Sequence, residues 1–219
     1  MVDAVHSVLA QEEVEVEVVV VDDASSDGSA DVVADTFAGD LRVTVLHQPD
    51  NLGPSAARNR GTTAAAAELV TFLDSDDVLV AGGLARQLEA LRAPGGPDAV
   101  VGSGRLVHVE GPSPAWARRL HEQGLTEPIW VSVLTDRRHL DAVGGFDEAM
   151  RMAEDIDLFV RLRESGARVE VLPDVVVERR RYGDNLTRDL EPGGDDLRMV
   201  LRRATARRRG QRSVEAPGS

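Results

Sequence analysis

The sequence contains no cysteine and no lysine, and aromatic residues make up only 3% of it. Without cysteine the chain can form neither disulfide bonds nor thiolate metal sites, which is typical of proteins in a reducing cytosol. The formal net charge of -13 argues against general nucleic-acid binding, because that function needs a basic face. No apolar run approaches the length of a membrane span. We therefore expect a soluble, cytoplasmic protein whose partners do not include nucleic acids.

The remaining composition is that of a globular domain, with 42% hydrophobic and 29% charged residues among 219. Hydrophobic patterning predicts strands near 14–21, 42–46, 69–73, 99–102, 105–109, 129–135 and 168–172, and helices near 3–10, 29–38, 54–67, 84–92 and 154–165. Because strand and helix alternate in the first half, we expect an α/β protein with a doubly wound, mostly parallel sheet flanked by helices. A Pro/Gly segment at 93–97 divides residues 1–97 from residues 98–192.

The most informative segment is 69–77, an apolar run that ends in three carboxylates among four residues. Strand alternation would point Asp74 and Asp76 to the same side. Carboxylate oxygens suit Mg²⁺ or Mn²⁺, which usually binds through one or two carboxylates together with substrate phosphates. The alternative is a loop whose acids only cap the next helix.

A second acidic cluster, Asp22 and Asp23, follows four consecutive valines at 18–21. Such a run is typical of a strand that is covered on both faces in a parallel sheet. Ligands of open α/β sheets bind outside the carboxyl ends of the strands, so two acid-tipped strands predict one shared crevice.

Five segments in this order and spacing resemble the family 2 glycosyltransferases of the GT-A fold. They are VDDASSDGS (21–29), NLGPSAARNRG (51–61), FLDSDD (72–77), VGGFDE (143–148) and EDIDLFVRL (154–162). The resemblance implies an inverting, metal-dependent hexosyltransferase that moves a sugar from a nucleotide-diphosphate sugar to an acceptor hydroxyl. It also implies that residues 1–192 form the catalytic domain, in which 1–97 bind the nucleotide-sugar and 98–192 face the acceptor.

The resemblance assigns roles to five acids. Asp155 would be the catalytic base, and Asp76 would hold the Mg²⁺ or Mn²⁺ ion. Asp74 would contact the ribose or the metal. Asp23 would meet the nucleobase, with Asp22 beside it.

Other candidate substrate contacts lie on a helix, a loop and a strand. By resemblance Arg58 would touch a phosphate or order the acidic loops, whereas the plainer alternative is an arginine paired with a nearby acid. Gly145 lies in a predicted tight loop that faces the acceptor, since glycine permits close backbone approach. Trp130, Trp116 and Tyr182 are candidates for stacking against a sugar, although core packing is the simpler role for each tryptophan.

Glu154 and Asp155 are predicted to begin a helix whose apolar face is Ile156, Phe159 and Val160. The helix dipole favours acids in a first turn, so these two acids also have a purely structural explanation. The resemblance instead places Glu154 at the substrate and makes Asp155 the base.

Residues 179–188 resemble a late family segment, but Tyr182 stands where that segment has histidine. The substitution puts a metal or diphosphate contact in doubt, although Arg180 or Arg181 could neutralise phosphate charge. We therefore include Arg181 among the candidate substrate contacts.

The chain also departs from the family at its start, because it begins inside the first helix and lacks the first strand. That strand is normally central, between the strands that end here at Val21 and Leu73. Either the reading frame continues upstream with a short Val/Ile-rich strand, or the sheet closes differently and donor binding is impaired. The second possibility favours a degenerate, non-catalytic sugar-nucleotide-binding or scaffold protein.

The tail, residues 193–219, is rich in arginine. Two interpretations remain open for it: a frayed, solvated helix, or peripheral contact with anionic lipid headgroups at a membrane.

Two other classes of protein are excluded in their usual forms. A phospho-receiver domain needs a lysine, and a dinucleotide-binding dehydrogenase needs a G-x-G-x-x-G motif, and the chain has neither.

Overall fold

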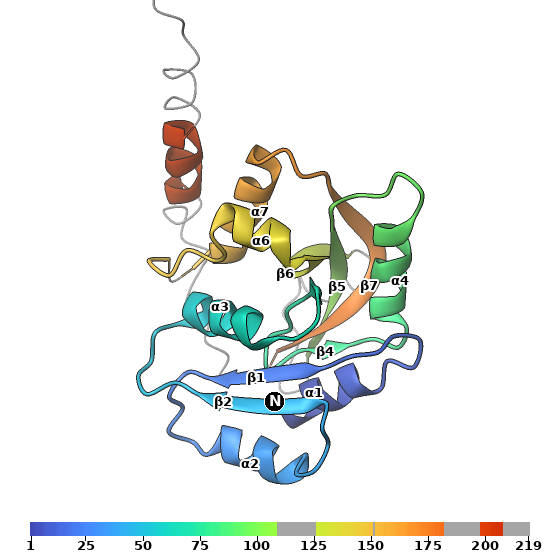
Figure 1. The fold of residues 1–219 in the computed structure, drawn as a ribbon, viewed down its shortest axis with the longest axis vertical. Helices are drawn as coiled ribbons and strands as arrows, with labels where there is room; N and C mark the ends of the chain where they lie inside the picture. Colours follow the sequence, from blue (N-terminus) through green and yellow to red (C-terminus); the bar gives the residue numbers. More distant parts are fainter. Residues whose placement is uncertain (109–125, 151, 182–197, 208–219) are drawn as a thin grey trace, which may run out of the picture.

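The computed structural model describes residues 1–108, 126–150, 152–181 and 198–207 (Figure 1). The helices are α1 (Val2–Leu9), α2 (Ser29–Thr36), α3 (Pro54–Ala64), α4 (Gly83–Arg92), α6 (Arg137–Val143), α7 (Glu154–Glu164) and a last helix over 198–207. The strands are β1 (Val18–Asp22), β2 (Val43–His47), β3 (Leu69–Val70), β4 (Val78–Leu79), β5 (Ala99–His108), β6 (Glu127–Asp136) and β7 (Val169–Arg181). None of the helices within these ranges is long and apolar enough to cross a membrane.

The strands form two sheets. β1 pairs in parallel with β2, while the larger sheet has the order β3-β6-β5-β7-β4. The expected α/β class is confirmed, but the larger sheet is mixed: β5 and β7 are parallel, whereas β3 and β5 run antiparallel to β6, and β4 runs antiparallel to β7. The prediction of a mostly parallel sheet was wrong because strand and helix alternate only as far as β3, which β4 follows with no helix between them. Beyond that point chain direction is no longer set by helical crossovers.

Two sheets exist because β1 and β3 do not pair with each other within the described residues. Between them lies a cavity of about 440 Å³, lined by β1, β3 and the side chains of α1 and α3 that face them. The valines at 18–21 are only half-buried, so the prediction that both faces of their strand are covered was wrong. Their edge faces the cavity instead of another strand. β1 and β3 are thus separate strands in two different sheets.

Helices cover both sheets. α4 packs against the larger sheet through Leu84, and α6 and α7 pack against it through Leu140, Leu158 and Leu162. Figure 1 shows these two groups on opposite sides of β5 and β7. A smaller core of Val5, Val33 and Phe37 joins α1 and α2 to the β1–β2 pair. The carboxyl ends of β1 and β3 remain at the margin of these cores, where the acids lie.

Candidate functional site

The acids after β3 form a compact turn. Hydrogen bonding in the strand ends at Val70, and the amide of Asp77 donates to the carbonyl oxygen of Asp74 at 3.1 Å. Asp76 is exposed and Asp77 is buried. Although Asp76 reaches the surface, partial desolvation by the surrounding turn and the charge of Asp74 raise its pKa, and burial raises the pKa of Asp77 to about 7 although the amide of Arg180 donates to it. The turn therefore concentrates negative charge that a bound cation would neutralise.

The turn after β3 offers carboxylates to a divalent cation. The described residues contain no group of three or more His, Asp or Glu side chains placed to hold a metal ion. Magnesium and manganese nevertheless bind through one or two carboxylates when phosphates supply the other ligands. The pKa of Asp76 is raised because desolvation and the charge of Asp74 outweigh the opposing charge of Arg179, so a cation bound beside Asp76 would relieve the repulsion from Asp74. Asp74 and Asp76 therefore fit a metal that arrives with a diphosphate.

Arg58 on α3 connects this turn to α7. Its Nη2 donates to Asp74 Oδ1 at 2.8 Å, and its Nη1 donates to Glu154 Oε1 at 2.6 Å. The guanidinium also lies over the ring of Phe146, 5.4 Å from the ring centre. The Arg58 and Glu154 side chains are only 16% and 11% exposed, so their ion pair is shielded from solvent, whereas Asp74 is 38% exposed and its pair is partly solvated. Arg58 thus orders two acidic segments that lie about 80 residues apart in the sequence.

Asp155 lies in the first turn of α7, beside Glu154. Its Oδ1 accepts from the amide of Ile156 at 2.8 Å. Burial raises the pKa of Asp155, the charge of Glu154 raises it further, and Arg58 partly opposes both. Ala153, which precedes the helix, has φ +57, a strained conformation for a residue with a Cβ atom. A carboxylate with a raised pKa at a strained helix start is typical of a functional group.

The apolar face predicted for α7 was wrong. Leu158 and Leu162 are buried in the core, whereas Ile156, Phe159 and Val160 are only half-buried. The helix is rotated because it also buries the acid Asp157, which is 1% exposed. A pattern that counts only apolar residues cannot detect an acid that is buried with its cationic partner.

The loop after α6 is held from α3. Gly145 has φ +67, and a Cβ there would lie 2.6 Å from Asn59 Oδ1. Asn59 Oδ1 accepts from the amide of Phe146, while its Nδ2 donates to the Phe146 carbonyl oxygen and to Glu148. Asn59 had no predicted role, although it is the neighbour of Arg58 in segment 51–61. Gly145 is therefore required by both its conformation and this close approach.

The acids after β1 organise a neighbouring loop. Asp23 accepts from Gln48 Nε2 at 2.5 Å and from the amides of Leu52 and Gly53 at 2.8 and 2.7 Å. Asp22 is buried, and hydrogen bonding by Ser25 holds its pKa below the usual value. In this structure Asp23 thus fixes the loop that precedes α3.

The structure places the remaining candidates unequally. Trp130 packs tilted against Phe159 of α7, with ring centres 4.3 Å apart, so it is part of the sheet–helix packing. Arg181 ends β7, but its side chain lies outside the described residues, as do Trp116 and Tyr182. Arg180 donates to Asp3 Oδ2 of α1 at 2.6 Å. The fold therefore brings together three features: the acids that follow β3, Arg58, and the first turn of α7.

Comparison with solved structures assigns this fold to the GT-A class of glycosyltransferases. The chain superposes on S. aureus TarS 1-349 in complex with UDP-GlcNAc with a TM-score of 0.72 and 22% identity, over 93% of this chain and 61% of that one. The chain belongs to the family described as Glycosyl transferase family 2, whose model matches residues 1–152.

Two curated relatives extend the match. The chain is 34% identical to a pre-mycofactocin glycosyltransferase of Mycobacterium tuberculosis over 84% of its length and 42% of the relative's. It is 31% identical to the succinoglycan biosynthesis protein ExoU of Rhizobium meliloti, over 77% of this chain and 54% of that protein. The chain thus spans about half the length of these relatives.

Proposed function

We propose that the protein transfers a sugar from a nucleotide-diphosphate sugar to an acceptor hydroxyl, with inversion at the anomeric carbon. The observation that carries this proposal is the bridge from Asp74 through Arg58 to Glu154, because it holds the turn after β3 next to the carboxylate of Asp155. The family match and the structural similarity to a protein solved with UDP-GlcNAc support a nucleotide-sugar donor.

In the proposed reaction Asp155 accepts the proton of the acceptor hydroxyl, and the oxygen of that hydroxyl attacks the anomeric carbon. The bond between that carbon and the diphosphate oxygen breaks, and the nucleotide diphosphate leaves with the bonding electrons. General-base assistance of this kind is typically worth about 10² to 10⁴ in rate. The raised pKa, caused mainly by burial, makes Asp155 a stronger base than an exposed aspartate.

The other residues bind and orient. Asp76, with Asp74 beside it, would hold a Mg²⁺ or Mn²⁺ ion, which when bound would stabilise the charge of the departing diphosphate. Arg58 keeps Asp74 and Glu154 in place. Asp23, which now fixes the loop at 48–53, would approach the nucleobase from the end of β1.

The second candidate is a protein that binds the sugar-nucleotide without turnover, and it is favoured by the edge of β1 that pairs with no strand among the described residues. Calorimetry with UDP, dTDP and GDP, each with Mn²⁺, measures binding, and release of UDP from UDP-GlcNAc measures turnover. We expect one nucleotide to bind and its sugar conjugate to be consumed. Binding without consumption of any matching donor would assign the non-catalytic role.

A further inference from the structure

The arginine-rich helix over 198–207 packs on the protein body. Val200 and Ala204 are buried at 1% and 8% exposure. Together with Arg203 and Arg207 they follow the spacing i, i+3, i+4, i+7, so all four lie on one face. The interpretation of this part of the tail as a frayed, solvated helix is therefore wrong. A solvated helix would leave this face exposed.

Both arginines of this face pair with acids of the acceptor side. Arg203 forms an ion pair with Asp147 of the loop that contains Gly145. Arg207 donates through Nε to Glu164 Oε2 of α7 at 2.7 Å, and its Nη1 lies 3.5 Å from Asp157 Oδ1. One helix thus contacts both the loop and α7.

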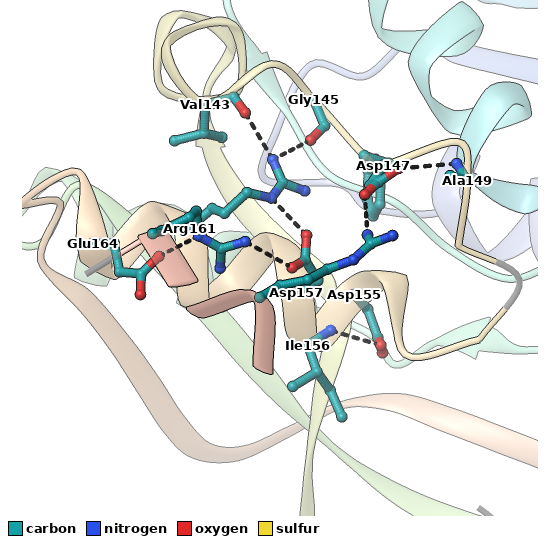
Figure 2. A network of polar contacts seen from close by, with 12 residues as sticks. Val143, Gly145, Asp147, Ala149, Asp155, Ile156, Asp157, Arg161 and Glu164 are labelled. Atoms are coloured by element: carbon teal, nitrogen blue, oxygen red, sulfur yellow. Dashed lines mark hydrogen bonds and ion pairs between the residues drawn. The ribbon is translucent and has the colours of Figure 1, made fainter. Parts of the chain in front are cut away.

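Asp157 is the centre of this network (Figure 2). Its Oδ2 accepts from Arg161 Nε at 2.6 Å, and Arg161 Nη1 donates to the carbonyl oxygens of Val143 and Gly145. Among the described residues, Asp157 Oδ1 accepts no hydrogen bond, which leaves the nearby guanidinium of Arg207 to balance it. A buried carboxylate is costly unless it is paired, so Arg207 stabilises the turn of α7 that also carries Asp155.

We infer that Arg203 and Arg207 are positioning residues: the helix over 198–207 fixes the Gly145 loop relative to the first turn of α7. The loop is then held on two sides, by Asn59 of α3 and by Arg203. The catalytic part of this inference rests on the proposed function, because it is Asp155 that the network would align with an acceptor. The structural part does not.

Hydrogen exchange tests the structural part. We compare the double variant Arg203→Gln/Arg207→Gln with Arg202→Gln, which changes an exposed arginine of the same helix. Amides of the 144–149 loop and of the first turn of α7 should exchange about tenfold faster in the double variant and at the wild-type rate in the control. Unchanged exchange in both segments would overturn the inference, whether or not the protein is a glycosyltransferase.

Single lysine variants separate positioning from general destabilisation. Arg203→Lys should retain wild-type exchange in the loop, because one ammonium group can pair with Asp147. Arg207→Lys should raise the exchange rate in the first turn of α7 above that of the wild type. Arg207 uses two nitrogens of a rigid guanidinium to reach Glu164 and Asp157, and one ammonium group cannot replace both. Equal behaviour of the two variants would contradict the inference.

Release of UDP from UDP-GlcNAc with Mn²⁺ then tests the catalytic part. The double variant should lower kcat with the donor KM unchanged, and Arg202→Gln should lower neither. A changed donor KM with unchanged kcat would overturn the positioning role. If the wild-type protein releases no UDP, the proposed function fails for this donor, and the exchange experiment still decides the structural inference.

Discussion

Replacing Arg58 with glutamine removes the cation that joins the two halves of the site. In the wild type it neutralises Asp74 and Glu154, whose side chains are 38% and 11% exposed. Removing one partner of a buried ion pair typically costs about 3 to 5 kcal/mol. Because Asp74 is partly solvated, we expect the free energy of unfolding to fall by about 2 to 4 kcal/mol at pH 8.

The loss should depend on pH through Asp155. Its pKa in the folded protein is raised, mainly by burial and then by Glu154, and Arg58 limits that rise. A carboxyl whose folded pKa is raised contributes stability below its unfolded pKa, and that stability is lost as the pH rises through the folded pKa. Without Arg58 the pKa of Asp155 rises further, so the variant should lose more stability at pH 8 than at pH 4. The acid limb of kcat/KM should also move to higher pH.

Urea unfolding at pH 4 and pH 8 measures both effects, with Arg60→Gln as the matched control. Arg60 lies on the same helix but donates to the carbonyl oxygen of His47 and not to Asp74 or Glu154. The control should lose less than about 1 kcal/mol at either pH. A loss in Arg58→Gln that equals the control, or that does not change with pH, would refute the bridging role.

Three further outcomes are expected. Asp76→Ala should reduce nucleotide affinity in Mn²⁺ to the level measured in EDTA, and wild-type affinity that is undiminished in EDTA would contradict the metal proposal. Gly145→Ala should lower the unfolding free energy by about 2 kcal/mol, since φ is +67 and the new Cβ would lie 2.6 Å from Asn59; an unchanged melting temperature would show that the loop adapts. The amide hydrogen of Val19 should exchange with solvent at least about tenfold faster than that of Val18, because the amide of Val18 donates to the carbonyl oxygen of Arg42 and successive amides of a strand point to opposite edges. Equal exchange rates would mean that the other edge of β1 is covered.

Much of the local structure could be predicted from the sequence. The helices at 54–64, 83–92 and 154–164 begin within one residue of their expected starts. Asp74 and Asp155 were predicted to serve one site, and Arg58 bonds to Asp74 and to Glu154, the neighbour of Asp155 in the sequence. These features depend on local periodicity and on a motif order that a sequence displays directly.

Features that depend on tertiary contacts could not be predicted. α6 was missed because its seven residues show too little periodicity, and the two-residue β4 is a strand only because β7 pairs with it. The rotation of α7 depends on Asp157, which is buried through Arg161 and Arg207 rather than through hydrophobicity. The last helix was interpreted as a solvated tail because its inward face includes Arg203 and Arg207, whose acid partners Asp147 and Glu164 lie 56 and 43 residues earlier in the sequence.

The division of the chain at 93–97 remains a prediction. β3 and β4, which belong to residues 1–97, pair with β6 and β7 of the second half. The lipid interpretation of the tail also remains a prediction, although two of its arginines contact the protein itself.

The central claim is that Asp155 is the base of an inverting sugar transfer. The most direct measurement compares Asp155→Asn with the wild type, using the dissociation constant of the donor and the turnover rate in the same Mn²⁺ buffer. We expect nearly unchanged donor binding and a turnover rate lowered by about 10² or more, because Asp155 would act only on the acceptor hydroxyl. Equal losses of binding and turnover would contradict it and would assign Asp155 to the metal site or to the fold of α7.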